Sequence, residues 1–335
     1  MATLDDPTPV QSNCSPTVAP PVTLAARMRA HLAILRVDHW TKNIFIVPGI
    51  LVPLSVAHLP LDGALLWRLF VGTLATCLIA SSNYVLNEIL DAPFDRLHPV
   101  KNQRPVACGL VNIPIAYAQW LLLFVIGEAL AAQVSRPLVW ILGTLWLMAC
   151  IYNVPPVRSK DVVYLDVLSE AVNNPLRMLA GWYTVTTTIF PPISLLVSYW
   201  MIGGYLMALK RFSEYREIND YHRAGAYRRS FLKYSEESLL VSVMFYASAA
   251  MLFLGAFVVR YRMELVLAFP LVATSMAIYF HLAFQENSPV QHPESLHRQW
   301  GLMATVLLCA LLMTALLFVD LPVMRKIFSP TMPLH

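Results

Sequence analysis

Charge is scarce in this chain of 335 residues, because only 13% of them are Asp, Glu, Lys or Arg. Soluble domains usually carry about 25% charged residues, whereas 57% of this chain is hydrophobic. A soluble protein this apolar would need a core larger than a chain of this length can enclose. The composition therefore argues against an ordinary soluble enzyme and predicts an all-α, polytopic membrane protein with a single domain.

Cysteine is also sparse, and its pattern excludes two further classes of protein. The 5 cysteines are odd in number and form no Cys-x-x-Cys pair, so neither a disulfide framework nor a zinc site is expected. The net charge of +4 does not indicate a nucleic-acid partner. In a membrane protein the position of basic residues matters more than their sum, and we expect membrane lipids around the chain instead.

Long apolar runs are what the sequence has in abundance. A helix needs about 20 apolar residues to cross a bilayer, and the runs predict about nine spans around a central cavity. Residues 1–23 are polar and proline-rich, without the features of a signal peptide, so we expect a disordered tail before a domain over 24–325 and a short tail over 326–335. The expected spans are 44–58, 65–90, 114–134, 137–153, 163–186, 192–210, 238–259, 263–284 and 301–320.

The distribution of Lys and Arg predicts the orientation of the chain. If the N-terminus is cytoplasmic, most of the 24 basic residues fall on the cytoplasmic side of the predicted spans. We expect a multi-pass protein of the inner membrane, and cytoplasmic loops of such proteins carry the excess of basic residues. Its N-terminus and its charge-rich loops, which include the candidate active site described next, would face the cytoplasm.

The second predicted span ends in a regular row of polar residues. Asn83, Asn87, Asp91 and Asp95 recur every fourth residue, which places them on one face of a helix, with Glu88 nearby. Carboxylates this close repel each other unless a cation neutralises them, and oxygen ligands without Cys or His suit Mg²⁺. The sequence therefore predicts a magnesium site with Asn87, Glu88, Asp91 and Asp95 as candidate ligands.

Basic residues follow this acidic row at once. Arg96, Lys101 and Arg104 lie within ten residues of it, and a metal-holding acid cluster beside cations can bind a diphosphate. The alternative interpretation is an ordinary solvated helix end, whose bases reflect only the excess of Lys and Arg on the cytoplasmic side. We favour the diphosphate site because four polar residues recur every fourth position along one helix. Pro93 removes a helix hydrogen bond, so the sequence leaves open whether the helix continues to Asp95.

The fifth predicted span carries a second polar cluster. Asp166, Glu170, Asn173, Asn174 and Arg177 fall on one continuous face of a helix over 163–186. Ionisable groups inside a span are costly and normally face a cavity or a partner. Hydrogen bonds between helices would explain the asparagines, but they explain an Asp, a Glu and an Arg together poorly. We therefore expect a polar cavity beside this face.

A third cluster opens the loop after the sixth predicted span. Lys210, Arg211 and Glu214 lie at the expected membrane boundary, on the same side as Tyr152 and Lys160. For Lys210 and Arg211, a binding site and a charged surface are equally compatible with the pattern. The more distal bases of the loop are typical of a surface that faces anionic lipid: Arg223, Arg228 and Arg229.

At these residues the sequence resembles a known family. The stretch NEILDAPFD, residues 87–95, resembles the N-D-x-x-D-x-x-x-D motif of the UbiA superfamily of intramembrane prenyltransferases, with Glu88 where Asp is usual. The stretches DRLHPVKNQRPVACG and YNVPPVRSKDVVYLDVL are also similar to that family, and the resemblance covers residues 36–320. It implies about nine helices around a central cavity and Mg²⁺ as cofactor, with Asn87, Asp91 and Asp95 as ligands of the metal and the diphosphate.

One departure from the family pattern concerns the donor. Where the family has a second Asp-rich motif, this chain reads LKRFSEYRE, which is similar to the branch of decaprenyl-phosphate phosphoribosyltransferases. The stretches HWTKN, HPVKNQRP and LRMLAG are similar to the same branch. This resemblance implies phosphoribosyl diphosphate (PRPP) as donor and a polyprenyl phosphate as acceptor. We favour that reaction over prenyl transfer from a prenyl diphosphate to an aromatic or other small acceptor.

The residue patterns and the resemblance together define a candidate site. A non-catalytic lipid transporter is the rival from another class, because acids that face a bundle cavity also serve proton relays. The acids here cluster at a helix end, however, and transport sites lie near the midplane. We expect these catalytic residues: Asn87, Asp91, Asp95, Lys160 and Asp166. We expect these substrate-binding residues: Lys42, Asn83, Arg96, Lys101, Arg104, Tyr152, Arg177, Lys210, Arg211 and Glu214.

Overall fold

The computed structural model describes residues 23–57, 59–96, 101–218, 225, 228–291 and 293–328. Within these ranges the chain is helical and has no strand, which confirms the predicted all-α class. Several parts of the sequence predictions lie outside the described residues: the N-terminal tail apart from Thr23, residue 58 of the first predicted span, residues 97–100 of the stretch that resembles the family, Arg223, and residues 329–335 of the C-terminal tail.

Long helices dominate the chain and short 3₁₀ segments connect them. The α-helices are α1 (Leu24–Ala33), α2 (Val47–Ala57), α3 (Gly63–Asp95), α4 (Ile113–Val134), α5 (Arg136–Asn153), α6 (Leu165–Ala171), α7 (Asn173–Val185), α8 (Ile193–Ile218), α10 (Glu236–Tyr261), α11 (Phe269–Leu282), α12 (Trp300–Phe318) and α13 (Pro322–Ile327). The 3₁₀ segments are η1 (Val37–Ile46), η2 (Lys101–Gln103), η3 (Ser159–Asp161), η4 (Arg229–Leu232), η5 (Met263–Ala268), η6 (Pro289–Gln291) and η7 (Pro293–Arg298).

Polar side chains mark where several long helices begin. Asp62, Asn112 and Ser135 precede α3, α4 and α5, and each side chain accepts a hydrogen bond from a backbone N–H of the first turn. These caps satisfy donors that have no partner inside the helix. At the other end of α3, Pro93 lies inside the helix without ending it, because the helix continues through Asp95. The predicted row from Asn83 to Asp95 therefore lies on one helix.

Seven helical stretches of the described residues are long and apolar enough to cross a membrane. They are 24–57, 63–95, 113–134, 193–218, 236–261, 263–282 and 300–318. The predicted number of nine is not confirmed by this criterion. The predicted span 137–153 corresponds to α5, which has 18 residues, and the predicted span 163–186 is divided between α6 and α7 at Val172.

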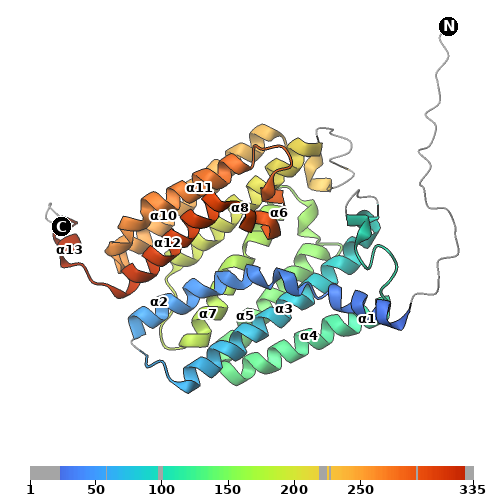
Figure 1. Ribbon diagram of the computed structural model, residues 1–335, viewed down its shortest axis with the longest axis horizontal. Coiled ribbons are helices and arrows are strands. Elements are labelled where there is room, and N and C mark those ends of the chain that lie inside the picture. The colour runs from blue at the N-terminus through green and yellow to red at the C-terminus, as the bar shows by residue number, and fades with distance from the viewer. Residues whose placement is uncertain are drawn as a thin grey trace, which may run out of the picture.

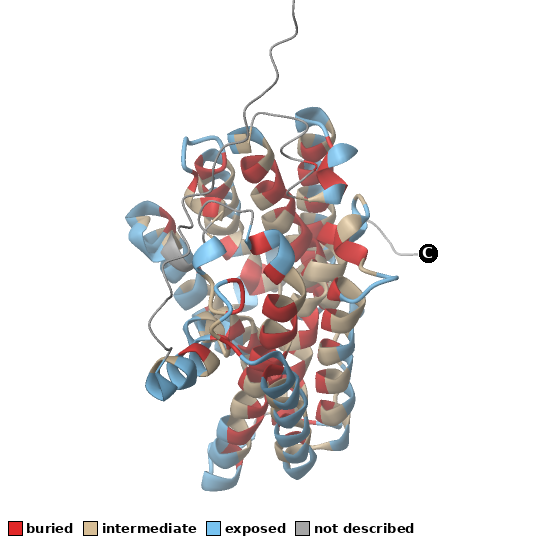
Figure 2. Ribbon diagram, turned by 90° about the vertical axis from the view of Figure 1, so that its right-hand side faces the viewer, coloured by how far each residue is buried: buried red, intermediate tan, exposed pale blue. Residues whose placement is uncertain are grey.

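The helices form two groups that lie side by side (Figure 1). One group contains α2, α3, α4, α5 and α7, and the other contains α8, α10, α11 and α12. Buried residues gather between the helices and exposed residues lie on the outward faces (Figure 2). Large apolar side chains such as Trp140, Phe245, Leu252 and Leu311 are exposed. This is the surface expected of helices whose surroundings are lipid.

Close helix packing inside the first group depends on glycine. A Cβ atom added at Gly49 of α2 would lie 1.9 Å from the carbonyl oxygen of Met178 in α7. One added at Gly181 of α7 would lie 2.3 Å from the carbonyl oxygen of Ile46. Small residues let membrane helices approach backbone to backbone. The two glycines therefore hold α7 against the segment that joins η1 and α2.

The bundle has two distinct ends. We name the end that holds the carboxyl ends of α3, α5 and α8 the polar end, and the opposite end, with α13 and the loop 186–192, the far end (Figure 1). Arg68 and Asp95 lie near opposite ends of α3, about 40 Å apart at a rise of about 1.5 Å per residue. The predicted site residues gather toward the polar end.

Candidate active site

Asp91, near the end of α3, lies in a cluster of cations that the chain after α5 provides. Its Oδ1 contacts the ammonium of Lys160, and Nη2 of Arg158 lies 3.5 Å from the same oxygen. Nζ of Lys160 also donates to Oδ1 of Asn153 at 2.8 Å. Burial lowers the pKa of Lys160, while Asp91 raises it. The carboxylate thus offsets part of the cost of burying this cation.

The polar loop after α3 folds back onto the helix. Nη1 of Arg104 lies 2.8 Å from Oδ2 of Asp95, and the Asp95 side chain is only 7% exposed. The backbone N–H of Val106 donates to Oε1 of Glu88 at 3.4 Å, so the Glu88 carboxylate is turned toward the loop. Nε of Arg96 donates to the carbonyl oxygen of a loop residue at 3.2 Å. Arg104 therefore joins the acids, whereas Arg96 holds the loop backbone.

The asparagines of the row differ from each other in their surroundings. Nδ2 of Asn83 donates to the carbonyl oxygen of Leu145 in α5 at 3.1 Å, so this side chain lies against a neighbouring helix. The amide oxygens of Asn83 and Asn87 are both buried without a hydrogen-bond partner. Buried polar atoms normally have partners, so an unsatisfied oxygen at Asn87, one turn before Asp91, is open to a ligand.

These oxygens fit a magnesium ion better than a metal that needs a dense protein cage. Among the described residues, no three His, Cys, Asp or Glu side chains come together as a metal-binding group. Mg²⁺ is usually held by one or two carboxylates, with waters and substrate phosphates completing its shell. Asn87, Asp91 and Asp95 supply an amide oxygen and two carboxylates along one helix face. The residues present therefore fit Mg²⁺.

The carboxyl end of α8 carries a second and more enclosed ionic network. Nη1 of Arg211 lies 2.7 Å from Oε2 of Glu214, and its Nε lies 3.3 Å from Oδ2 of Asp166 in α6. Nη2 of Arg211 donates to the Tyr152 hydroxyl at 3.3 Å. Lys210 lies within electrostatic range of Glu214 and of Arg211. Arg211 is therefore held in place by groups from α5, α6 and its own helix.

Asp166 is fully enclosed within this network, with 0% of its surface exposed. Its carboxylate accepts hydrogen bonds from Oγ of Ser230 at 3.2 Å and from the Tyr234 hydroxyl at 2.7 Å. Nη1 of Arg228 lies 3.5 Å from Oδ2 of Asp166. Burial raises the pKa of Tyr234, and the charge of Asp166 raises it further. The carboxylate thus connects α6, the end of α8 and the segment that precedes α10.

One expectation about these residues is wrong and another stays a prediction. Arg228 is not a lipid-facing surface base, because its side chain is only 17% exposed beside Asp166. The fifth predicted span is divided into α6 and α7, but backbone hydrogen bonds from Val172 to Leu168 and from Leu176 to Val172 continue across the junction. Asp166 contacts Arg211 on one side of the junction, while Arg177 on the other side donates from Nε to Oδ1 of Asn43 at 3.0 Å.

Lys42 and Arg177 lie away from the acids of α3, deeper along the bundle. Nζ of Lys42 lies 5.8 Å from the centre of the Tyr84 ring, and Arg177 is near enough to Tyr84 to interact electrostatically with it. Tyr84 precedes Asp91 by about two helical turns, or about 10 Å. The expected role of Lys42 and Arg177 as phosphate partners remains a prediction.

Lys101 lies between the two helix ends. It belongs to η2 and is near enough to interact with Asp95 and Arg104 at the end of α3 and with Glu214 at the end of α8. Burial lowers the pKa of its ammonium, Glu214 raises it, and Arg104 lowers it. The acidic row and the basic helix end are thus parts of one site at the polar end.

Sequence reasoning did not assign several residues that complete this site. Asn153 and Arg158 lie within the stretch YNVPPVRSKDVVYLDVL, which resembles the family. That resemblance is a signal that both residues could belong to the site. Ser230 and Tyr234 meet Asp166 across more than sixty positions of sequence, and no local period marks them. Contacts between loops and distant helices carry no periodic pattern that a single sequence could reveal.

Comparison with known families and structures agrees with this fold. Residues 45–300 match the UbiA prenyltransferase family. The nodulation protein NoeC of Azorhizobium caulinodans is 31% identical over 227 residues, which is 67% of this chain and 69% of NoeC. Decaprenyl-phosphate phosphoribosyltransferase of Mycolicibacterium smegmatis is 25% identical over 251 residues, which is 73% of this chain and 74% of that enzyme.

A solved structure has the same helical fold. The UbiA homologue of Archaeoglobus fulgidus bound to DMAPP and Mg²⁺ superposes with a TM-score of 0.64 at 19% identity, covering 86% of this chain and 97% of that one. The family match over most of the chain and this likeness in fold agree with the arrangement of apolar helices described above. The chain is an integral membrane protein that belongs to the UbiA prenyltransferase family.

Proposed function

We propose that this protein is a Mg²⁺-dependent transferase that moves a phosphoribosyl group from PRPP to a polyprenyl phosphate, with loss of diphosphate. The observation that carries the proposal is the basic end of α8, where Lys210 and Arg211 stand in place of a second acidic motif. The similarity to decaprenyl-phosphate phosphoribosyltransferase supports it.

The number of anionic groups favours PRPP over a prenyl diphosphate. Prenyl transfer to a neutral acceptor brings one diphosphate into the site. Phosphoribosyl transfer brings a diphosphate, the 5-phosphate of the ribose and the phosphate of the acceptor lipid. Cations paired with phosphate oxygens stabilise such groups, and basic side chains lie at both helix ends of this site. A second acidic cluster would repel the additional phosphates.

The acidic row would hold the metal and the leaving group. Asn87, Asp91 and Asp95 are the proposed Mg²⁺ ligands, and Glu88 supports the loop that carries Arg104. When bound, Mg²⁺ neutralises charge that develops on the departing diphosphate. Lys160 and Arg158 lie against Asp91, so they are placed to pair with diphosphate oxygens beside the metal.

The reaction itself needs little proton transfer. A phosphate oxygen of the acceptor attacks the anomeric carbon of the ribosyl group, and the bond from that carbon to the diphosphate oxygen breaks with its electron pair leaving on diphosphate. A phosphate monoester carries a charge of about −1.5 to −2 at pH 7, so the attacking oxygen is already deprotonated. The site is therefore proposed to act by positioning and by electrostatic stabilisation.

Arg211 and Asp166 have different proposed roles. Arg211 touches the region where we place the 5-phosphate, together with Lys210 and Lys101. Asp166 is fully enclosed and contacts Arg211, Ser230 and Tyr234, so we assign it as a positioning residue that fixes the Arg211 guanidinium. This differs from the direct catalytic role that the sequence suggests for Asp166.

Two parallel assays test the donor. Purified protein with Mg²⁺ receives labelled PRPP and polyprenyl phosphate in one tube, and labelled prenyl diphosphate and 4-hydroxybenzoate in the other. We expect labelled lipid that depends on both polyprenyl phosphate and Mg²⁺ in the first tube. Labelled product in the second tube alone would contradict phosphoribosyl transfer and favour prenyl transfer. Asp62→Asn is a matched control variant, because it changes an acid of the same helix at the far end and Asn also caps helices well.

A further inference from the structure

A polar cavity lies at the far end of the bundle, about 40 Å from the acids of α3. Its volume is about 530 Å³. Arg68 comes from the first turns of α3 and Arg136 from the first residue of α5, so two separate helices bring their guanidinium groups to it. None of its described lining residues is acidic; the others are Val134, Ser135, Pro137 and Thr187.

Arg68 has donor capacity that the protein does not use. Its Nη2 donates to the carbonyl oxygen of Val185 at 3.0 Å, which fixes the side chain beneath the loop 186–192. Its Nε is buried and has no hydrogen-bond partner. A buried donor without an acceptor is costly, and a guanidinium suits the paired oxygens of a phosphate. Arg136 is exposed at the same cavity and adds a second positive charge.

The position of these two arginines is unusual for the chain. Most of its basic residues fall at or near the polar end, as expected for the cytoplasmic side of a membrane protein. Arg68 and Arg136 depart from this distribution, and they converge on one cavity although 67 intervening positions separate them in the sequence. Two guanidinium groups that line one cavity without an acid among its described lining residues favour an anion there. The cavity is thus suited to receive negative charge.

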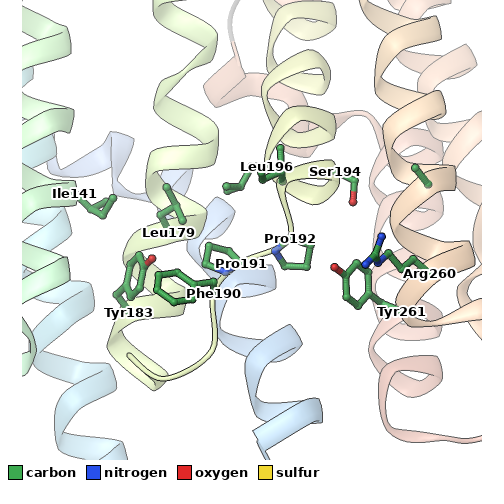
Figure 3. A pocket seen from close by; sticks show the side chains of 12 residues that line it. Ile141, Leu179, Tyr183, Phe190, Pro191, Pro192, Ser194, Leu196, Arg260 and Tyr261 are labelled. Atoms are coloured by element: carbon green, nitrogen blue, oxygen red, sulfur yellow. The ribbon is translucent and has the colours of Figure 1, made fainter.

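A second cavity of about 840 Å³ has a mainly apolar lining, with Arg260 and Tyr261 at one side of it (Figure 3). The loop after α7 contributes to the lining of both cavities. Tyr183 lines the apolar cavity with its ring, and its carbonyl oxygen accepts a hydrogen bond of 2.9 Å from Oγ of Ser135 in the polar cavity. Thr187 lines the polar cavity, while Phe190 and Pro191 of the same loop line the apolar one.

We infer that the far end binds an anionic phospholipid, with its phosphate between Arg68 and Arg136 and an acyl chain in the apolar cavity. A cationic pocket next to a mainly apolar one, in which Arg260 is the single charged residue of the described lining, matches an amphiphile with one charged end. Inorganic phosphate has the same anionic chemistry but would leave the apolar cavity without a use. The site is separate from the proposed active site, so its failure would leave the proposed function unaffected.

The test compares lipids and variants in detergent solution. The thermal unfolding midpoint of the full chain is measured with phosphatidylglycerol, with phosphatidylcholine and with inorganic phosphate, and native mass spectrometry counts retained lipids. We expect phosphatidylglycerol to raise the midpoint and to be retained. Arg136→Gln should weaken its apparent affinity about tenfold, because one charge-assisted contact is lost. Arg136 is exposed, so this variant is expected to fold.

Three further variants make the outcome decisive. Arg68→Lys keeps the charge but loses the planar fork, and we expect a smaller loss of affinity than with Arg68→Gln. Arg262→Gln removes another arginine at the far end that lines neither cavity, and it should retain the wild-type response. Equal stabilisation by both lipids, or equal responses of Arg136→Gln and Arg262→Gln, would overturn the inference. Stabilisation by inorganic phosphate as strong as by phosphatidylglycerol would overturn the assignment to a lipid.

Discussion

The carboxyl ends of α3 and α8 have opposite designs, although both helices continue beyond the predicted ends of their spans. At α3 the helix supplies acids, and the following loops supply the cations Arg104, Arg158 and Lys160. At α8 the helix supplies both the cation Arg211 and the acid Glu214, and α6 supplies the second acid, Asp166. Each end therefore carries paired charges, but the cations at α3 come from the loops, whereas the central cation at α8 comes from the helix.

Exposure separates the two ends further. The Asp91 side chain is 23% exposed, whereas the Arg211 and Asp166 side chains are 4% and 0% exposed. A metal ion or a phosphate can reach Asp91 from solvent, but nothing from solvent reaches Asp166. The α3 end is thus arranged to exchange ligands, and the deepest part of the α8 end is arranged to hold a guanidinium in one position. Changes at Asp91 should affect turnover, and changes at Asp166 should affect stability.

The largest effect is expected at the α3 end. Asp91→Asn removes a proposed metal ligand and the partner of Lys160, and we expect turnover to fall by about 10²–10³-fold, the scale of losing one electrostatic contribution to catalysis. The measurement is the initial rate of labelled lipid formation as a function of Mg²⁺ concentration. Asp62→Asn should retain the wild-type rate. Unchanged turnover in Asp91→Asn would remove the acidic row from the proposed mechanism.

The next effect concerns stability at the α8 end. Asp166→Asn removes the buried charge that faces Arg211, and breaking one partner of a buried ion pair costs about 3 kcal/mol or more. We expect a clear fall in the thermal unfolding midpoint in detergent. Tyr234→Phe is the matched variant, because it removes one hydrogen bond of 2.7 Å to the same carboxylate and should cost less. A larger loss in Tyr234→Phe than in Asp166→Asn would contradict the central place of the carboxylate.

The two ends also differ in how far the sequence predicts them. The period of four from Asn83 to Asp95 places the acids on one face, because helix geometry alone determines that face. The partners of these acids could not be derived in the same way, since Arg158 and Lys160 reach Asp91 through the loop after α5. Hydropathy and length do not decide whether one proline ends a helix, and only the structure shows that Pro93 does not.

At the α8 end, local pattern predicts less. Glu214 follows Arg211 by three residues, and that spacing does predict their contact on a helix. The contacts of Asp166 with Ser230 and Tyr234 depend on how a distant segment packs. Such long-range packing overrides local periodicity, which is why the fold class was predictable and the enclosed network was not.

A third prediction concerns the choice of donor at the α8 end. Lys210→Gln removes a cation that we place near the 5-phosphate of PRPP, and we expect the KM for PRPP to rise about tenfold, the scale of one charge-assisted contact. The KM for polyprenyl phosphate should change less. Arg229→Gln is the matched control, because Arg229 is an exposed base of the following segment. Equal effects on both substrates would show that Lys210 does not distinguish the donor.

The smallest expected effect joins the two ends through Lys101. Burial lowers the pKa of its ammonium below the ordinary lysine value of 10.5, so this lysine loses its proton at a lower pH than an exposed lysine does. As the pH rises through the lowered pKa, the positive charge facing the phosphates disappears, and we expect the KM for PRPP to rise a few-fold. Lys101→Arg should abolish that rise, because a guanidinium remains charged throughout. The measurement is KM against pH for both proteins, and identical alkaline profiles would exclude Lys101 as the titrating contact between the acidic row and the basic helix end.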